Sequence, residues 1–252
     1  MDNRYIMVPY EIIDEAEHQE LIIALYIYLM YNYNAFRQVY TSPSYMLHQC
    51  GYGYNNNSKS RGHFEKISSA INWLIDNGYI WMIEDPVTGN QDVNICECKP
   101  NQHFNIELSE KCFENLGKHV RLHFPEYEKM HFLFFDKDYP SYRKLVNLFF
   151  LILQNVHFEK GEKFYYYVCT IDKLVDKKAA GTKATIYKLI AMLEEIDLLH
   201  GATAGSIKAA KFTIAPPHVF IRHSDNWENE LEYAVSKTDR DRNSYFKLKG
   251  VI

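Results

Sequence analysis

The sequence predicts an α+β protein that contains one helix-and-strand unit twice. Three observations support this prediction. An amphipathic helix is expected within residues 57–80, two β-strands are expected after it, and the apolar frame of the helix returns within residues 182–199. A chain of 252 residues has room for two ordinary domains, and 47% hydrophobic residues, with 20 Tyr and 15 Phe, supply core material for both.

The first helix is predicted from the spacing of its apolar residues. Within residues 57–80 the spacing gathers five of them on one side of a helix, namely Phe64, Ile67, Ile71, Leu74 and Ile75. The Asn-Gly pair at positions 77 and 78 ends this helix, because glycine tolerates the left-handed conformation of a C-terminal cap.

A preceding helix and two following strands complete the first unit. Residues 79–83 are β-branched and aromatic and predict a strand, and residues 93–98 predict a returning strand after a run of turn formers. A hydroxyl cap and a proline at positions 41–43 predict the start of a helix over residues 44–50, which a long turn at 51–58 separates from the next helix. Helix, turn, helix and two-stranded ribbon is the order of a winged-helix (helix-turn-helix) domain.

The same frame occurs a second time. Residues 182–199 carry apolar side chains in register with the first helix, so that Ile67 corresponds to Ile186 and the turn residue Gly78 corresponds to Asp197. Two copies make a tandem and not an array. The predicted fold class is therefore α+β, with two tandem winged-helix domains.

Four segments are expected along the chain. They are an N-terminal winged-helix domain at residues 1–100, a connecting segment packed between the domains at 101–140, a C-terminal winged-helix domain at 141–216 and a C-terminal tail at 217–252. In the connecting segment we expect a strand at 104–108 and a short helix at 109–120. In the second domain we expect a wing from residue 201 with a return strand at 212–215, and in the tail a helix at 227–235.

Charge is distributed unevenly over the chain. The formal net charge of -4 argues against a broad, non-specific nucleic-acid coat, and residues 1–100 hold 6 basic against 12 acidic groups, whereas residues 165–212 hold 7 against 5. Basic and short polar side chains cluster where the two predicted recognition helices begin, and such a helix meets base edges and phosphates there. The alternative is that these lysines form an ordinary solvated helix surface.

The candidate DNA-binding residues come from both units. Those of the first unit are Asn57, Lys59, Arg61, His63 and Lys66. Those of the second unit, whose pattern fits DNA binding better, are Lys173, Lys177, Lys178, Thr182, Lys183, Thr185, Lys188, Lys208 and Lys211. Lys183 corresponds to the apolar Phe64 of the first unit, which places Lys183 at the edge of its helix.

About the first 100 residues resemble a known family. Val8-Pro9, then Ile12-Ile13-Asp14, a hydrophobic helix, a helix-turn-helix and a helix that runs into Asn77-Gly78-Tyr79-Ile80 resemble the N-terminal winged-helix domain of replication initiators from plasmids and phages of Gram-positive bacteria. The resemblance implies double-stranded origin DNA as a partner, with host replication proteins as further partners, and leaves a homodimer open. The chain departs from the pattern in its acidic N-terminal third.

Neither catalysis nor a metal or other cofactor is expected. The chain has no Gly-x-x-x-x-Gly-Lys-Ser/Thr loop and no His-x-His pair. Cys96, Cys98, His103 and Cys112 form a metal-like grouping, but Cys-x-Cys differs from the Cys-x-x-Cys of zinc knuckles, so plain buried thiols are favoured. The odd number of 5 cysteines indicates a reducing compartment, and no apolar run has the length of a spanning helix, so a cytoplasmic protein is expected.

The favoured function is sequence-specific binding of double-stranded DNA by a replication initiator of a plasmid or another mobile element. Two alternatives stay open. A winged-helix transcriptional regulator would need only an operator and no replisome contacts. A winged-helix docking module would instead bind protein through the acidic residues near the N-terminus, Glu11, Asp14, Glu15, Glu17 and Glu20.

Overall fold

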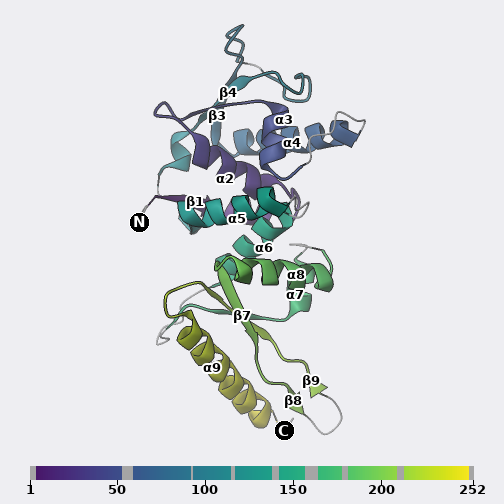
Figure 1. Ribbon diagram of the computed structural model, residues 1–252, viewed down its shortest axis with the longest axis vertical. Coiled ribbons are helices and arrows are strands. Elements are labelled where there is room, and N and C mark those ends of the chain that lie inside the picture. The colour runs from purple at the N-terminus through teal and green to yellow at the C-terminus, as the bar shows by residue number, and fades with distance from the viewer. Residues whose placement is uncertain are drawn as a thin grey trace. The chain divides into compact units, whose positions relative to one another are not determined.

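The chain has an α+β fold, as the sequence predicts, and forms two compact units (Figure 1). A computed structural model describes residues 4–52, 59–91, 93–114, 117–137, 142–156, 164–177, 181–208 and 213–249. The first unit comprises residues Met1–Asn147 and the second Leu148–Ile252. No helix in the described ranges combines the length and the apolar character that a membrane crossing requires.

The first unit contains a three-stranded antiparallel sheet in the order β2-β4-β3, together with three helices. In chain order these elements are α2 (Ile22–Asn32), β2 (Gln38–Thr41), α3 (Pro43–Gln49), α4 (Lys59–Asp76), β3 (Ile80–Glu84) and β4 (Phe104–Leu108). The nine residues of α2 from Ile22 to Met30 are all buried, because the helix is apolar on every side. It forms the centre of this unit.

The remaining elements of the first unit lie before and after this sheet in the chain. They are β1 (Tyr5–Pro9), α1 (Tyr10–Glu15), the short 3-10 helix η1 (Glu110–Cys112), β5 (His119–His123) and α5 (Phe124–Lys137). β1 and β5 pair antiparallel, with Tyr5 opposite His123. Residues 101–140, expected to connect the domains, thus supply one strand of each sheet of the first unit.

The second unit repeats the order of the first. Helix α6 (Tyr142–Asn155) spans the division between the units and is followed by β6 (Tyr167–Cys169), α7 (Ile171–Asp176), α8 (Lys183–Glu195), β7 (Leu199–Thr203), β8 (Ile207–Lys208), β9 (Thr213–Ile214), β10 (His218–Arg222) and α9 (Trp227–Leu248). Its sheet has the order β6-β10-β7, so β6, β10 and β7 correspond to β2, β4 and β3.

The turns after α4 and α8 show the repeat at the level of the backbone. Gly78 and Asp197 both adopt a positive φ, of 72° and 51°. The residue after each turn donates its N–H to a carbonyl five positions earlier, Tyr79 to Leu74 at 2.8 Å and Leu198 to Leu193 at 3.0 Å. Glycine and aspartate both tolerate this conformation, so the same helix end is made from two different residues.

The structure differs from the sequence prediction at the return strands. Residues 93–98 form turns and not a strand, since Asn94 accepts the backbone N–H of Cys96 through its side chain and that of Glu97 through its carbonyl. The return strand is β4, which confirms the strand predicted at 104–108 but gives it a place in the sheet of the first unit. Its residues alternate between buried and half-buried positions. In the second unit the strand after the wing continues beyond Pro217 as β10, in which Val219, Phe220 and Ile221 are fully buried.

Two helix predictions also need correction. The predicted helix at 109–120 is only the three residues of η1, followed by β5. The predicted tail helix at 227–235 extends to Leu248 as α9, because its half-buried and buried residues keep a helical spacing through the charged stretch. Within α4, the buried stripe excludes Ile75, which is 39% exposed.

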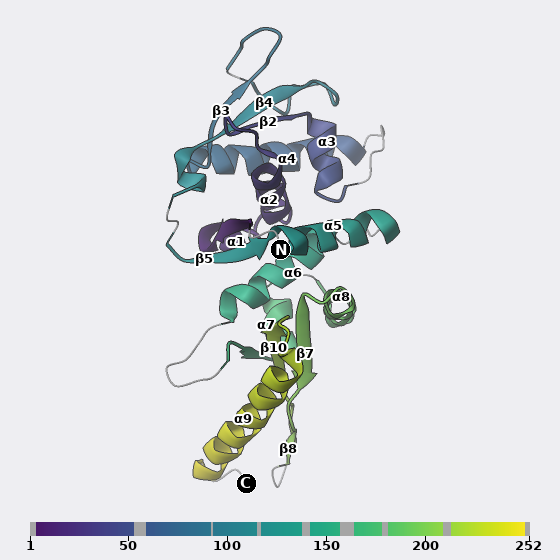
Figure 2. The same ribbon diagram turned by 60° about the vertical axis from the view of Figure 1, so that its left-hand side comes forward.

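Helices α8 and α9 cover opposite faces of the second sheet. Val219 packs with Ala204 and with Ala234 of α9. The next residue of β10, Phe220, points to the other face, where it lies against Gly201, whose N–H donates to the Glu194 carboxylate of α8 at 3.0 Å. Figure 2 shows α8 and α9 on either side of β7 and β10.

Candidate nucleic-acid interface

Helix α8 begins with a hydroxyl cap and presents a polar outer surface. The Thr182 hydroxyl accepts the backbone N–H of Thr185 at 3.3 Å, and the two hydroxyls lie 3.0 Å apart. Five residues of α8 are buried, namely Ile186, Leu189, Ile190, Met192 and Leu193. The exposed residues of α8 are Lys183, Ala184, Tyr187, Lys188, Ala191 and Glu195. The two lysines lie in the first half of the helix, and the carboxylate of Glu195 is its last residue.

Lys183 lies at the edge of this surface, as the sequence comparison of the two units predicts. Its Nζ is 2.6 Å from the carboxylate of Asp172 in α7, and both side chains are largely exposed. The hydrogen bond that the Lys183 ammonium donates to the Asp172 carboxylate raises the pKa of Lys183. The pair connects α7 to the start of α8 and partly neutralises Lys183.

Further cations of the second unit lie on α7 and directly after it. Lys173 is exposed, with its Nζ 5.6 Å from the ring centroid of Tyr167, and Lys177 is exposed at the C-cap of α7. Together with Lys188 they form what we call the α7–α8 surface, defined by Lys173, Lys177, Thr182, Lys183 and Lys188. Lys178 and Lys211 lie outside the described residues, and Lys208 belongs to β8.

Helix α9 holds the base of the β8–β9 ribbon, the segment that the sequence predicts as the second wing. The Arg242 guanidinium donates to the carbonyl oxygens of Gly205, at 2.6 Å, and Ala215, at 3.1 Å. The Gly205 N–H in turn donates to the carboxylate of Asp239 at 2.7 Å. These bonds tie the two sides of the wing to one helix, and the sequence analysis did not predict them.

The corresponding surface of the first unit has a mixed charge. Lys66 is exposed on α4, where the described exposed side chains also include Glu65 and Asp76. His63 is half-buried against the ring of Tyr52, 4.5 Å between centroids, and burial, Lys66 and Arg143 lower its pKa. His63 is therefore expected to be neutral at physiological pH.

Three predicted residues of the first unit are only partly placed. Lys59 and Arg61 belong to the first turn of α4, and Asn57 lies outside the described residues. Arg143, which the sequence analysis did not single out, stacks 3.6 Å from the centroid of Tyr52 and donates to the Gly51 carbonyl at 2.7 Å. It fixes the start of the turn that precedes α4.

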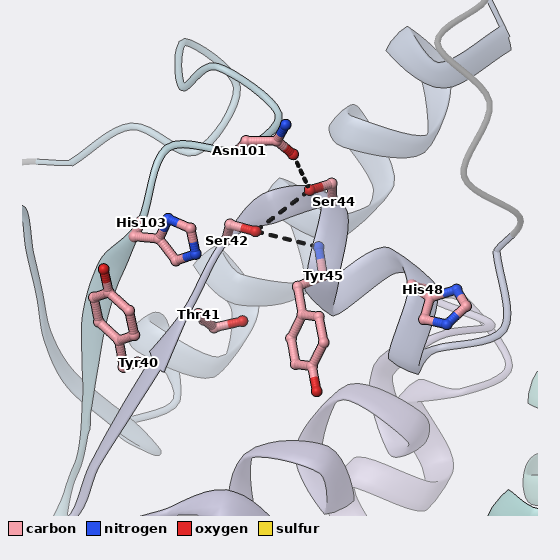
Figure 3. A pocket seen from close by; sticks show the side chains of 8 residues that line it. All are labelled: Tyr40, Thr41, Ser42, Ser44, Tyr45, His48, Asn101 and His103. Atoms are coloured by element: carbon pink, nitrogen blue, oxygen red, sulfur yellow. Dashed lines mark hydrogen bonds between the residues drawn. The ribbon is translucent and has the colours of Figure 1, made fainter.

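A hollow of about 640 Å³ lies beside the first turn of α3 (Figure 3). Its walls are Tyr40, Thr41, Ser42, Ser44, Tyr45, His48, Asn101 and His103. Ser42 caps α3 by accepting the Tyr45 N–H, and the Ser44 hydroxyl donates to Asn101 at 2.8 Å. The rings of Tyr40 and His103 are stacked at 4.9 Å. The walls offer hydroxyls and ring faces without lysine or arginine, which suits a sugar or a base better than a phosphate.

The sulfur and imidazole grouping near the first wing does not form a metal centre in the described residues. No three ligand atoms among Cys96, Cys98, His103 and Cys112 gather within 4.8 Å. Cys112 is buried, as predicted, with its thiol 3.1 Å from the Tyr79 carbonyl. Cys96 is exposed and Cys98 is partly exposed, so the prediction of buried thiols is wrong for Cys96.

Comparison with known proteins gives one structural likeness. No protein-family model matches the chain. No curated protein matches it in sequence. The crystal structure of the Pi initiator protein in complex with iteron DNA is similar over 89% of this chain and 99% of that chain, with 11% sequence identity and a TM-score of 0.47. The function proposed for this chain therefore depends on its own residues.

Proposed function

We propose that this protein binds double-stranded DNA in a sequence-specific manner through two tandem winged-helix units, and that it acts as a replication initiator of a plasmid or another mobile element. The protein would act by binding, without catalytic chemistry of its own. Melting of the origin and loading of a helicase would then require host replication proteins.

The α7–α8 surface carries this proposal. It joins exposed lysines to a hydroxyl-capped helix whose outer surface is polar, and the helix is followed by strands that extend into a wing. Lysines neutralise phosphates, and threonine at a helix start reaches base edges or phosphate oxygens. The order β6, α7, α8, β7, β10 supports the winged-helix interpretation, because α8 then occupies the position of a recognition helix.

The first unit has the same order of elements, and we propose that it contacts DNA less strongly. Its helix α4 has one described exposed lysine, Lys66, and two exposed carboxylates, Glu65 and Asp76. Helices α7 and α8 also carry exposed carboxylates, but these lie among several exposed lysines. Carboxylates repel phosphates, so the balance of charge favours the second unit. The role in replication, as distinct from transcription, is inferred from the sequence resemblance of the first 100 residues. Affinity would then come mainly from the second unit, and the first would add sequence contacts or protein contacts.

The test is selection of a binding site followed by a replication assay. Untagged protein would be used to select duplexes from a random pool, and repeats of the selected site would be placed on a vector without its own origin. We expect the vector to be maintained in cells that express this chain, and to be lost with the Lys173, Lys177 and Lys188 alanine variant. Repression of a reporter through the same site without vector maintenance would favour a transcriptional regulator and would contradict the replication role.

A further inference from the structure

We propose that Asp197, His200 and His223 form a binding site for a divalent transition-metal ion, Zn²⁺ by preference, at the C-terminal end of α8. One nitrogen of each imidazole and one carboxylate oxygen lie within 4.8 Å of one another, and no other such group of three occurs among the described residues. The site lies wholly within the second unit and does not depend on the proposed DNA-binding function.

The two histidines already face each other through the atoms that would bind the metal. His200 Nε2 and His223 Nδ1 are 2.8 Å apart, as in a hydrogen bond between two neutral rings. A tetrahedral Zn²⁺ with bonds of about 2.0–2.1 Å to nitrogen needs them roughly 3.3 Å apart. His223 is exposed and can move outward by that small amount, and the exposed Asp197 carboxylate can turn inward.

The backbone holds all three residues in place. Asp197 occupies the left-handed turn after α8, His200 lies in β7 opposite Ile221 of β10, and His223 donates its N–H to the Leu198 carbonyl at 3.1 Å. The His200 ring is 6% exposed and stacks on Trp227, the first residue of α9, at 3.8 Å. A site that is assembled before the metal arrives loses little entropy on binding.

The donor set determines which ion fits. Two imidazoles and one carboxylate suit Zn²⁺, with water as the fourth ligand, whereas Mg²⁺ and Ca²⁺ require more oxygen ligands. The buried His200 ring, stacked on Trp227, supplies the inner ligand, and the exposed His223 and Asp197 supply the outer ones. Bound metal would connect the end of α8 to the β10–α9 corner and would stabilise the second unit.

The experiment is a titration of the untagged, chelator-treated full-length chain with ZnCl₂ by calorimetry, combined with thermal melts. His223→Gln removes an exposed ligand, and Asp197→Gly removes the carboxylate while providing the residue that the first unit has at the same turn, Gly78. The double variant Cys96→Ser/Cys98→Ser is the matched control, because these two accessible thiols are possible metal ligands in the first unit, away from the proposed site.

We expect one Zn²⁺ per chain in the wild type and in the cysteine control, and affinity roughly 100-fold weaker in each ligand variant. At a free Zn²⁺ concentration of about 100 times the dissociation constant, the melting midpoint should rise by on the order of 10 °C in the wild type and not in the ligand variants. Absence of stoichiometric binding, binding that survives in both ligand variants, or binding that is lost in the cysteine control would overturn the proposal.

Discussion

Replacing Lys173, Lys177 and Lys188 together by alanine is expected to weaken DNA binding and to flatten its dependence on salt. All three side chains are exposed on or directly after α7, or on the outer surface of α8. Lys183 is left in place, because Asp172 lies 2.6 Å from its Nζ and already balances part of its charge. The variant thus removes three of the four lysines of the α7–α8 surface without breaking the Lys183–Asp172 ion pair.

The size of the effect follows from counterion release. Each contact between a lysine and a phosphate contributes about 0.9 to the slope of log affinity against log salt, so three contacts contribute about 2.7. Between 1 M and about 0.1 M salt, counterion release raises the affinity roughly 8-fold for each contact, and roughly 500-fold for all three contacts. The loss should be similar for specific and random duplexes, since phosphates carry no sequence information.

Fluorescence anisotropy of a labelled duplex over a salt series measures both the affinity and the slope. The matched control replaces Arg240 and Lys247 of α9 and its C-cap residue Lys249 by alanine. These exposed residues carry the same formal charge and belong to the helix on the other face of the sheet. We expect the control to stay within about threefold of the wild type, because α8 and α9 cover opposite faces of the sheet and salt screens longer-range attraction. Equal losses in both variants would mean that net charge alone governs binding, and would refute the α7–α8 surface as the interface.

Three further predictions concern the two turns, the half-buried His131 and the base of the second wing. Gly78→Ala should destabilise the first unit by about 1–2 kcal/mol in a thermal melt, because the residue has a positive φ, which costs alanine free energy even though there is open space around it. Asp197→Gly at the matching turn should not destabilise the metal-free second unit, because glycine adopts a positive φ readily. Burial, and then the nearby His48, lower the pKa of His131 from 6.5 to about 4, so its contribution to stability is complete above about pH 6.5 and declines as the pH falls towards 4. The loss should be on the order of 1 kcal/mol at about pH 5 after allowance for partial exposure, and a melting series in which His131→Gln shows the same pH dependence as the wild type would contradict it. Arg242→Gln should speed amide exchange in residues 201–208 by about tenfold, which corresponds to roughly 1.4 kcal/mol, and unchanged exchange there would mean that α9 does not hold the wing.

The repeat could be predicted from the sequence because it is encoded locally. Ile67 and Ile186 are buried on the inner sides of α4 and α8, where the apolar spacing places them. Gly78 and Asp197 end the two helices in the same backbone conformation. Spacing and capping act over a few residues, so they are visible without knowledge of the fold.

The return strands could not be placed from the sequence, because strand pairing is a contact between distant residues. Ile95 is an apolar residue in a run that resembles a strand, yet the sheet takes Phe104, Ile106 and Leu108, which alternate into the core. The wing between the two strands of the first unit is therefore longer than the turn signals indicate. In the second unit Pro216 and Pro217 suggested a domain end, although β10 begins directly after them.

The residues of the proposed metal site and of the hollow beside α3 could not be grouped from the sequence, for the same reason. His200 and His223 come from two paired strands, and Asp197 comes from the turn before the first of these strands. The hollow beside α3 joins residues of β2 and α3 to Asn101 and His103. A motif search finds residues that lie at a short, regular spacing in the sequence. Neither of these two groups of residues has such a spacing.

The most direct test of the central claim is the affinity of the untagged, full-length protein for duplex DNA, measured by fluorescence anisotropy between about 50 and 300 mM salt. Binding with a log-log slope of several units, reduced in the α7–α8 alanine variant and kept in the α9 control, is the expected result. If no duplex is bound even at the lowest salt concentration, the protein does not bind DNA in the proposed way, and its two units would instead serve as a docking module for another protein.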